Sequence, residues 1–235
     1  SVASAGSVRD GLSPRPGVQG TAPGERESRT PIQGVRKHTA AAMVQSAFTA
    51  PHASEFLTID VTPTMDLIAT LKESAAFRGK RLNLLTVVAK ALCIAAGRNP
   101  AVNSRWDDAA QEIIQFHYVN LGIATATPRG LMVPNIKDAH SLDLVGLAES
   151  LTELVETAKA GTASPADLSG GTISITNIGS FGIDAGTPIL NTGEAMILAL
   201  GAVKRMPWEH RGEIALRQVL TLSVSFDHRL VDGEQ

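Results

Sequence analysis

Apolar and polar residues follow two different periods along this chain, and the changes of period mark its predicted helices and strands. Where apolar residues recur about every 3.6 positions, one face of a helix can pack against a core. Ser141 is a residue type that caps helix N-termini and Gly161 is one that ends helices, so both are expected to bound the last helix. The predicted helices span residues 36–49, 65–78, 84–98 and 141–160.

In other segments apolar and polar residues alternate strictly, which is typical of a strand with one buried face. The first strand is predicted at residues 52–62, where Leu57, Ile59 and Val61 share one face. Later strands are predicted at residues 113–127, 131–136, 172–178, 195–203 and 214–226, with a turn at residues 128–130. Since helices and strands mix in one region, the pattern predicts an α/β (α+β) fold with a mixed β-sheet and helices on one face.

The first 30 residues differ in composition from the rest of the chain. Gly, Pro, Ser and Ala account for 16 of them, and there is no aromatic residue, Ile or Met. Such a segment buries too little apolar surface to offset the entropy lost on ordering. Residues 1–30 are therefore predicted to be a flexible linker that follows something upstream, and residues 31–235 to be the globular domain.

Charge and cysteine content exclude several classes of function. A net charge of -2 gives no basic field for nucleic acid, and no apolar run has the length of a membrane helix. Cys93 is the single cysteine, so no disulfide can form within the chain, which favours a reducing compartment such as the cytoplasm. No cluster of Cys and His has the spacing of a metal site, and none is predicted.

A candidate for proton transfer stands where the last predicted strand ends. His228 lies in the run Asp-His-Arg-Leu-Val-Asp-Gly, four residues before Asp232. A histidine just past a strand end can project into a cleft, and its ordinary pKa near 6.5 suits a general base at neutral pH. The three residues between His228 and Asp232 supply no nucleophile, so the base is expected to act on an external substrate.

A second signal lies in the predicted strand at residues 172–178. Thr172, Ser174 and Thr176 alternate with isoleucines, so their hydroxyls are expected to face away from the core. A hydroxyl beside a reacting carbonyl can donate a hydrogen bond to the oxyanion that forms there. Ordinary β-propensity of threonine is the competing explanation of the same pattern.

These signals belong to a set of ordered motifs that resembles a known family. From about Thr30 to its end, the chain resembles the catalytic core domain of the dihydrolipoamide acyltransferase (E2) subunits of 2-oxoacid dehydrogenase complexes. The resemblance rests on the stretches Val-Arg-Lys at 35–37, Ala-Pro-His at 50–52, Ile-Asp-Val at 59–61, Gly-Leu-Met-Val-Pro at 130–134, Thr-Asn-Ile-Gly at 176–179, Thr-Pro-Ile-Leu-Asn at 187–191 and Phe-Asp-His-Arg-Leu-Val-Asp-Gly at 226–233.

The resemblance implies a chloramphenicol acetyltransferase-like fold that forms trimers, with active sites between subunits. It implies that residues 31–235 are the acyltransferase catalytic domain and that an acyl group moves between dihydrolipoamide and the thiol of coenzyme A. His228 would be the base, Thr176 the oxyanion donor from the neighbouring subunit, and Asp232 a residue that shapes the loop around His228.

The resemblance also implies partners and substrates. Coenzyme A would be a substrate, and the lipoyl group would be carried on a domain outside this chain, since no Asp-Lys-Ala lipoylation site occurs in it. The E1 and E3 subunits would bind through upstream domains, and the trimers could form a larger cage. The location would be cytoplasmic, or the mitochondrial matrix in a eukaryote. Residues that contact coenzyme A are not identified.

The sequence departs from the family pattern at three places. Thr176 stands where many members have serine, and Asn135 follows Pro134 where an apolar residue is usual. The chain stops at Gln235, where the family continues into a further helical segment, so the C-terminal end of the domain is expected to be missing.

Two alternative functions stay open, and two further residues have expected roles. The motif also fits another coenzyme A-dependent His-x-x-x-Asp-Gly acyltransferase, and a non-catalytic scaffold core is the alternative from a different class. The acyl group is assigned no further than branched-chain or pyruvate type. Arg36 is predicted to pair with Asp232, and His52 is expected to have a packing or hydrogen-bonding role.

Overall fold

The computed structural model describes residues 26–234, which divide into two units at Ile32. The described part of the first unit, residues 26–32, is exposed and contains neither helix nor strand. Most of the predicted linker, residues 1–25, lies outside the described residues. The second unit holds all the elements that follow.

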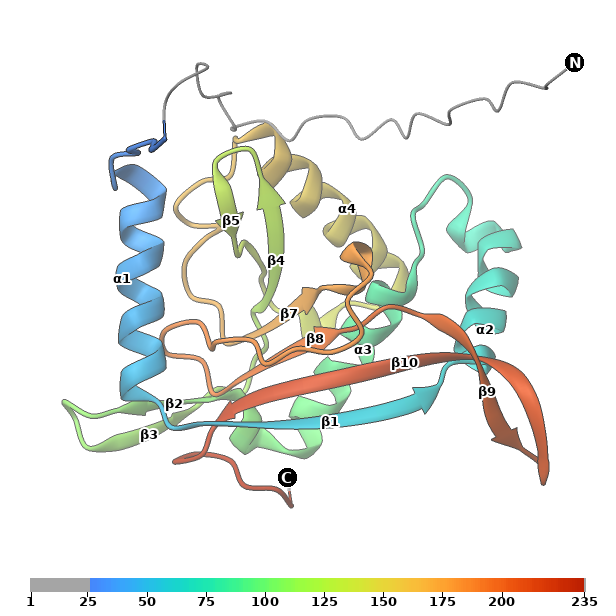
Figure 1. Ribbon diagram of the computed structural model, residues 1–235. Coiled ribbons are helices and arrows are strands. Elements are labelled where there is room, and N and C mark those ends of the chain that lie inside the picture. Colours follow the sequence, from blue (N-terminus) through green and yellow to red (C-terminus); the bar gives the residue numbers. More distant parts are fainter. Residues whose placement is uncertain (1–25, 235) are drawn as a thin grey trace, which may run out of the picture. The chain divides into compact units, whose positions relative to one another are not determined.

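A mixed sheet of eight strands forms the centre of the second unit (Figure 1). Its order is β1 (His52–Asp60), β10 (Glu213–Asp227), β8 (Met196–Leu200), β7 (Ile173–Asn177), β4 (Leu121–Thr127) and β5 (Gly130–Met132). The short strand β6 (Asn135–Ile136) pairs with β4, and β9 (Lys204–His210) pairs with β10. The pairs β4–β7 and β7–β8 are parallel, and the others are antiparallel, so the predicted mixed sheet is confirmed.

Two helices, α3 (Leu84–Arg98) and α4 (Leu144–Ala160), pack on one face of this sheet and form the main core with it. Ile173 and Ile175 of β7 are fully buried in that core. The outer face of α4 carries exposed acidic residues, whereas that of α3 is largely apolar, with Ile94 48% exposed. The two helices thus pack against the central strands β4, β7 and β8 and fix the positions of these strands, including Thr176 near the end of β7.

The other two helices lie at the borders of the sheet. α1 (Gly34–Thr49) touches the segment before β8, because the Ser46 hydroxyl donates to the Leu190 carbonyl over 2.6 Å. α2 (Thr62–Glu73) follows β1 directly and is extended by the short 3₁₀ turn Ala75–Phe77. The helix predicted at residues 65–78 is therefore observed as α2, which begins three residues earlier and ends five residues earlier than predicted.

The predicted N-cap of the last helix was wrong. Ser141 closes a 3₁₀ turn, Ala139–Ser141, instead of starting α4. The cap is Asp143, whose carboxylate accepts the Gly146 N–H over 2.7 Å. Both residue types are good caps, and only the neighbouring turn decides between them. Gly161 ends α4 with φ 73°, as predicted.

The single strand predicted at residues 113–127 is two strands in different sheets. β3 (Glu112–Gln115) forms a separate hairpin with β2 (Ser104–Asp107), a strand that was not predicted. The Asn103 amide donates to the carbonyls of Phe116 and Tyr118, which holds the chain out of the sheet between β3 and β4. β9 was also missed, because it contains Pro207, which strands tolerate only at an edge.

Candidate active site

His228 stands on the turn that follows β10. The Leu230 and Val231 N–H groups both donate to the Asp227 carbonyl, and the His228 N–H donates to the Pro51 carbonyl over 2.9 Å. The imidazole is exposed and lies against Phe226 with ring centroids 5.6 Å apart. Within residues 26–234 no hydrogen bond to the ring is present, so both ring nitrogens are open to an external group.

The residues on either side of His228 bind each other. The Asp227 carboxylate is buried, and it accepts the Arg229 backbone N–H over 3.0 Å. The same carboxylate accepts Arg229 Nε at 2.9 Å and Nη2 at 2.6 Å, a forked pair. Hydrogen bonding to Asp227 raises the pKa of Arg229. Two oppositely charged side chains therefore close the turn behind the histidine.

Thr176 occupies the second-last position of β7, half-buried between two small neighbours. Its partners across the sheet are Ala124 on β4 and Ala199 on β8. Paired residues point to the same face of a sheet, and two methyl groups leave the threonine hydroxyl uncrowded. The hydroxyl is therefore placed where a substrate group could meet it.

His228 and Thr176 do not meet within one chain. Thr176 is level with Ala199, and Ala199 is level with Ser223 of β10. His228 follows Ser223 by five residues, which is about 16 Å along an extended strand. Two strand spacings add about 10 Å across, so the two Cα atoms are roughly 19 Å apart. One chain therefore holds both groups without assembling them into one site.

The hydroxyl residues of the strand around Thr176 differ in their burial. Thr172 and Ser174 point away from the helices, as the alternation requires, but both are buried. The Thr172 hydroxyl accepts the Asn120 N–H over 3.1 Å, and Ser174 accepts the Asn191 amide, which belongs to the long irregular segment at residues 182–193. Ser223 on β10 accepts the Gly186 N–H there over 3.3 Å. The alternation with isoleucines is thus observed, although the face that carries Thr172 and Ser174 is buried as well.

Under that segment lies a carboxyl group that the sequence patterns did not single out. Glu194 is buried, and its carboxylate accepts the Ser174 hydroxyl at 2.9 Å and the Asn191 amide at 3.2 Å. The Asn191 amide also donates to Ser174. Burial raises the pKa of Glu194 to about 7, against the lowering effect of its hydrogen bonds. An acidic residue two positions before β8, whose five residues are all buried, was the available signal.

His52 has the hydrogen-bonding role that was expected. Its Nε2 accepts the Leu190 N–H at 3.0 Å, so its Nδ1 is the nitrogen that donates, to the Ala50 carbonyl at 2.7 Å. His52 is also level with Asp227 in the pairing of β1 and β10. It therefore connects the segment over the sheet with the strand end that carries His228.

Asp232 has a structural contact on its own loop. Its carboxylate accepts the Glu234 N–H over 3.0 Å. The predicted ion pair with Arg36 was not found: among residues 26–234 no ion pair joins the two, and Arg36 is exposed on α1. The last turn of α1 is bound instead to the segment that contains Leu190, through Ser46.

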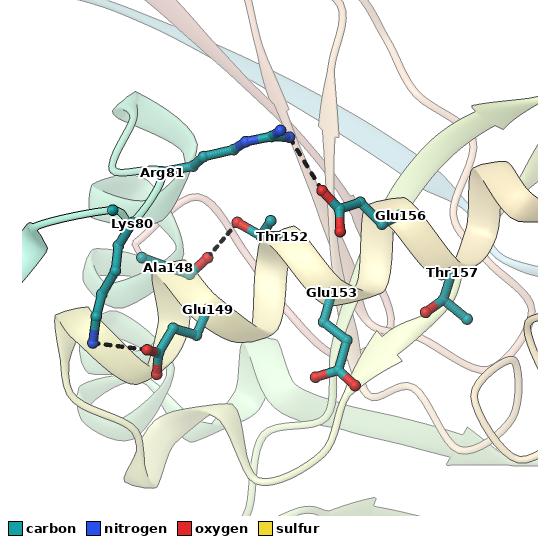
Figure 2. A pocket seen from close by; sticks show the side chains of 9 residues that line it. Lys80, Arg81, Ala148, Glu149, Thr152, Glu153, Glu156 and Thr157 are labelled. Carbon is teal, nitrogen blue, oxygen red and sulfur yellow. Dashed lines mark hydrogen bonds and ion pairs between the residues drawn. The ribbon is translucent and has the colours of Figure 1, made fainter.

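A surface groove on α4 is lined by none of these residues. Figure 2 shows a groove of about 490 Å³ between α4 and residues 79–81. Its charges largely neutralise each other, with Lys80 Nζ 2.7 Å from Glu149 and Arg81 Nη1 3.3 Å from Glu156.

In the described part of the chain no three His, Cys, Asp or Glu residues gather as a metal site would require. Nor is any helix of that part long and apolar enough to cross a membrane.

Comparison with known proteins assigns the family. The model of the family described as 2-oxoacid dehydrogenases acyltransferase (catalytic domain) matches residues 24–235. The chain belongs to this family. It is 40% identical over 207 residues to the dihydrolipoyllysine-residue acetyltransferase component of the pyruvate dehydrogenase complex of Bacillus subtilis, covering 88% of this chain and 47% of that protein. The chain thus spans about half the length of the curated relatives it matches.

Solved structures agree with this family. The dihydrolipoamide acetyltransferase of Azotobacter vinelandii is 29% identical with a TM-score of 0.84, over 88% of this chain and 86% of that one. The cubic core of a pyruvate dehydrogenase multienzyme complex matches with the same values. Chloramphenicol acetyltransferase, 13% identical with a TM-score of 0.50 over 86% of this chain and 90% of that one, shares the fold alone. The predicted chloramphenicol acetyltransferase-like fold is confirmed.

Proposed function

We propose that this chain transfers an acyl group between dihydrolipoamide and the thiol of coenzyme A, as the acyltransferase core of a 2-oxoacid dehydrogenase complex of the pyruvate type. Its relatives include the acetyltransferase component of pyruvate dehydrogenase at 40% identity. The observation that carries the proposal is His228, exposed at a strand end on a turn closed from behind by Asp227 and Arg229. The ring is presented outward with both nitrogens available.

A thiol substrate explains why a base is needed. With a pKa of about 8.5, only roughly 3% of a thiol is ionised at pH 7. His228 takes the proton of the coenzyme A thiol as sulfur attacks the thioester carbonyl of acyl-dihydrolipoamide. The carbonyl oxygen becomes an oxyanion, which accepts a hydrogen bond from Thr176. The imidazolium then returns the proton to the departing lipoyl sulfur, so the enzyme ends unchanged.

The estimated distance of roughly 19 Å between His228 and Thr176 within one chain supports a site shared between two copies. In a cyclic trimer each interface can bring the histidine of one chain to the threonine of the next. The proposal therefore includes a homotrimer, and a larger cage of trimers is supported by the similarity to a cubic core. It also includes a lipoyl group and E1 and E3 subunits bound through domains outside this chain, and a cytoplasmic location.

We place Asp232 in this site as the residue that shapes the loop around His228. Its hydrogen bond from Glu234 supports that role. The Azotobacter vinelandii structure was studied for the roles of a serine, a histidine and an asparagine in catalysis, the last two being four positions apart. His228 and Asp232 have the same spacing, with a carboxylate in place of the amide.

A shared site can be tested by complementation. His228→Ala should lower turnover of coenzyme A with acyl-dihydrolipoamide by about 10²–10⁴, the usual contribution of a general base. Thr176→Val should lower it as well. If equal amounts of the two variants are refolded together, random assembly gives intact residues at about one quarter of the sites of a cyclic oligomer. Activity near that fraction supports the proposal, whereas His228→Ala activity within threefold of the unsubstituted chain refutes it.

The acyl group can be assigned by comparing substrates. Acetyl-, isobutyryl- and succinyl-coenzyme A differ by a few apolar or charged contacts, each worth about 1–3 kcal/mol. An acetyl preference is expected from the pyruvate-type relatives. A higher kcat/KM for isobutyryl-coenzyme A would reassign the chain to the branched-chain type.

A further inference from the structure

The turn that carries His228 is held by backbone hydrogen bonds from Leu230 and Val231 to the Asp227 carbonyl, and also by an ion pair between the side chains on either side of the histidine. Asp227 and Arg229 are separated by one residue, and that residue is His228. Their ion pair has Arg229 Nη2 2.6 Å from Asp227 Oδ2, with side chains 30% and 4% exposed. A planar guanidinium that binds both carboxylate oxygens fixes orientation as well as distance. Because Asp227 and Arg229 bind each other, the side chain between them, His228, does not take part in the pair and is exposed to solvent.

A second contact fixes Arg229 from the other side. Its guanidinium carbon lies 4.9 Å from the centre of the Trp106 ring. Trp106 belongs to β2, in the hairpin that is separate from the main sheet, and its Nε1 donates to Asp108 over 3.2 Å. A cation over an aromatic ring is attracted within about 6 Å of its centre. The arginine is thus held between a buried carboxylate on β10 and an aromatic face on the hairpin.

We propose that Arg229, held by Asp227 and Trp106, is the positioning residue that sets the direction of the His228 imidazole. This proposal rests on the proposed acyl transfer for its kinetic consequence. The imidazole has no hydrogen bond of its own within residues 26–234, and its ring contact is with Phe226, whose centroid lies 5.6 Å away. Its direction therefore depends also on the backbone of the turn, which the Asp227–Arg229 pair links from residue to residue across the histidine. Arg229 therefore acts on the reaction through geometry and need not touch a substrate.

Substitutions at Arg229 test the role against a matched pair on the same strand. Arg217 of β10 also binds a carboxylate, Asp60, at 2.7 Å with 17% and 18% exposure, eleven residues before His228. Arg229→Ala should lower kcat by about 10–100-fold, as a misplacement near 1 Å can do, with KM within twofold. Arg217→Ala should lower the melting temperature without changing kcat. Equal kcat losses in the two variants would overturn the proposal.

Chemical rescue of kcat distinguishes a positioning role of Arg229 from a purely structural one. Guanidinium ion at millimolar concentration should restore kcat of Arg229→Ala in a saturable way, by occupying the space between Asp227 and Trp106. It should not restore a variant that also carries His228→Ala. Trp106→Phe, which keeps an aromatic face, should retain more activity than Trp106→Leu. Absence of rescue, or equal activity of the two tryptophan variants, counts against the positioning role.

One further measurement separates this proposal from the proposed reaction. The ring resonances of His228 in ¹⁵N-histidine-labelled protein, assigned by comparison with His228→Ala, report its side-chain order directly. They should broaden or shift in Arg229→Ala and stay unchanged in Arg217→Ala, whichever reaction is catalysed. Unchanged His228 signals in Arg229→Ala refute the positioning role, whereas failure of the acyl-transfer assay alone refutes the proposed function.

Discussion

Replacement of Glu194 by glutamine should flatten the dependence of stability on pH. Glu194 is buried beside Ser174 and Asn191, and its pKa is raised from 4.5 to about 7. The folded carboxyl keeps its proton up to about pH 7, whereas the unfolded one releases it near 4.5. Between these values the folded state binds more protons than the unfolded state, so the free energy of unfolding falls as pH rises.

The expected magnitude follows from the difference between the two pKa values. A difference of about 2.5 pH units, at about 1.36 kcal/mol for each unit, corresponds to about 3 kcal/mol. This stabilisation is fully present below pH 4.5, is lost as pH rises to about 7, and stays lost above that. Glu194→Gln keeps the shape of the protonated acid and cannot ionise, so it should lose none of its stability in this range for that reason.

The assay is urea unfolding at pH 5, 6, 7 and 8, at one protein concentration because the chain is expected to assemble. Relative to the unsubstituted chain, Glu194→Gln should gain about 2–3 kcal/mol between pH 5 and pH 8. Glu153→Gln is the matched control, since Glu153 is exposed on α4 (Figure 2). Parallel pH profiles for Glu194→Gln and the unsubstituted chain would refute the reasoning, as would an equal change in the Glu153 variant.

Substitutions at three other places in the fold have measurable consequences. Thr176→Val should lower kcat by about 10²–10³ through loss of one oxyanion donor, while Thr176→Ser retains most activity; equal rates of the two variants would show that the hydroxyl does not act. Gly201→Ala should lower the free energy of unfolding by about 3 kcal/mol, because the added carbon would lie 1.9 Å from the Asp184 carbonyl oxygen; urea unfolding with a loss below about 0.5 kcal/mol contradicts this close packing. Arg36→Ala and Asp232→Ala should have additive effects on stability within one chain, since no ion pair joins them, and a coupling above about 1 kcal/mol in a double-mutant cycle would show a contact between chains.

The apolar pattern predicted most helices and strands, because an element with one buried face shows a regular period and a fully buried element shows a continuous apolar run. α3 was predicted with the observed bounds, and β10 nearly so, since both carry a regular apolar pattern. The failures have local causes. The strand predicted at residues 113–127 is broken by the Asn103 amide, which binds two carbonyls of a segment distant in sequence. Such a side-chain bond leaves no trace in the apolar pattern.

The candidate site could be predicted only in its parts. His228, Thr176 and Asp232 are candidates because each stands in a recognisable motif. Their separation could not be found, since it depends on β8 lying between β7 and β10. Glu194 was missed because an acid between a polar turn and an apolar run has no assigned role until its partners Ser174 and Asn191 are known. Long-range order of strands and pairing of distant polar groups are set by the packed fold.

The position of β1 has a consequence for handling the protein. β1 ends the strand order, so its outer edge has no strand partner within residues 26–234. Phe56 and Leu57 on it are 53% and 61% exposed. An open, apolar strand edge is a template for pairing with another chain. Pairing of β1 edges between copies of the chain is therefore expected to cause aggregation that grows with protein concentration, and a charged residue on this strand would be expected to reduce it.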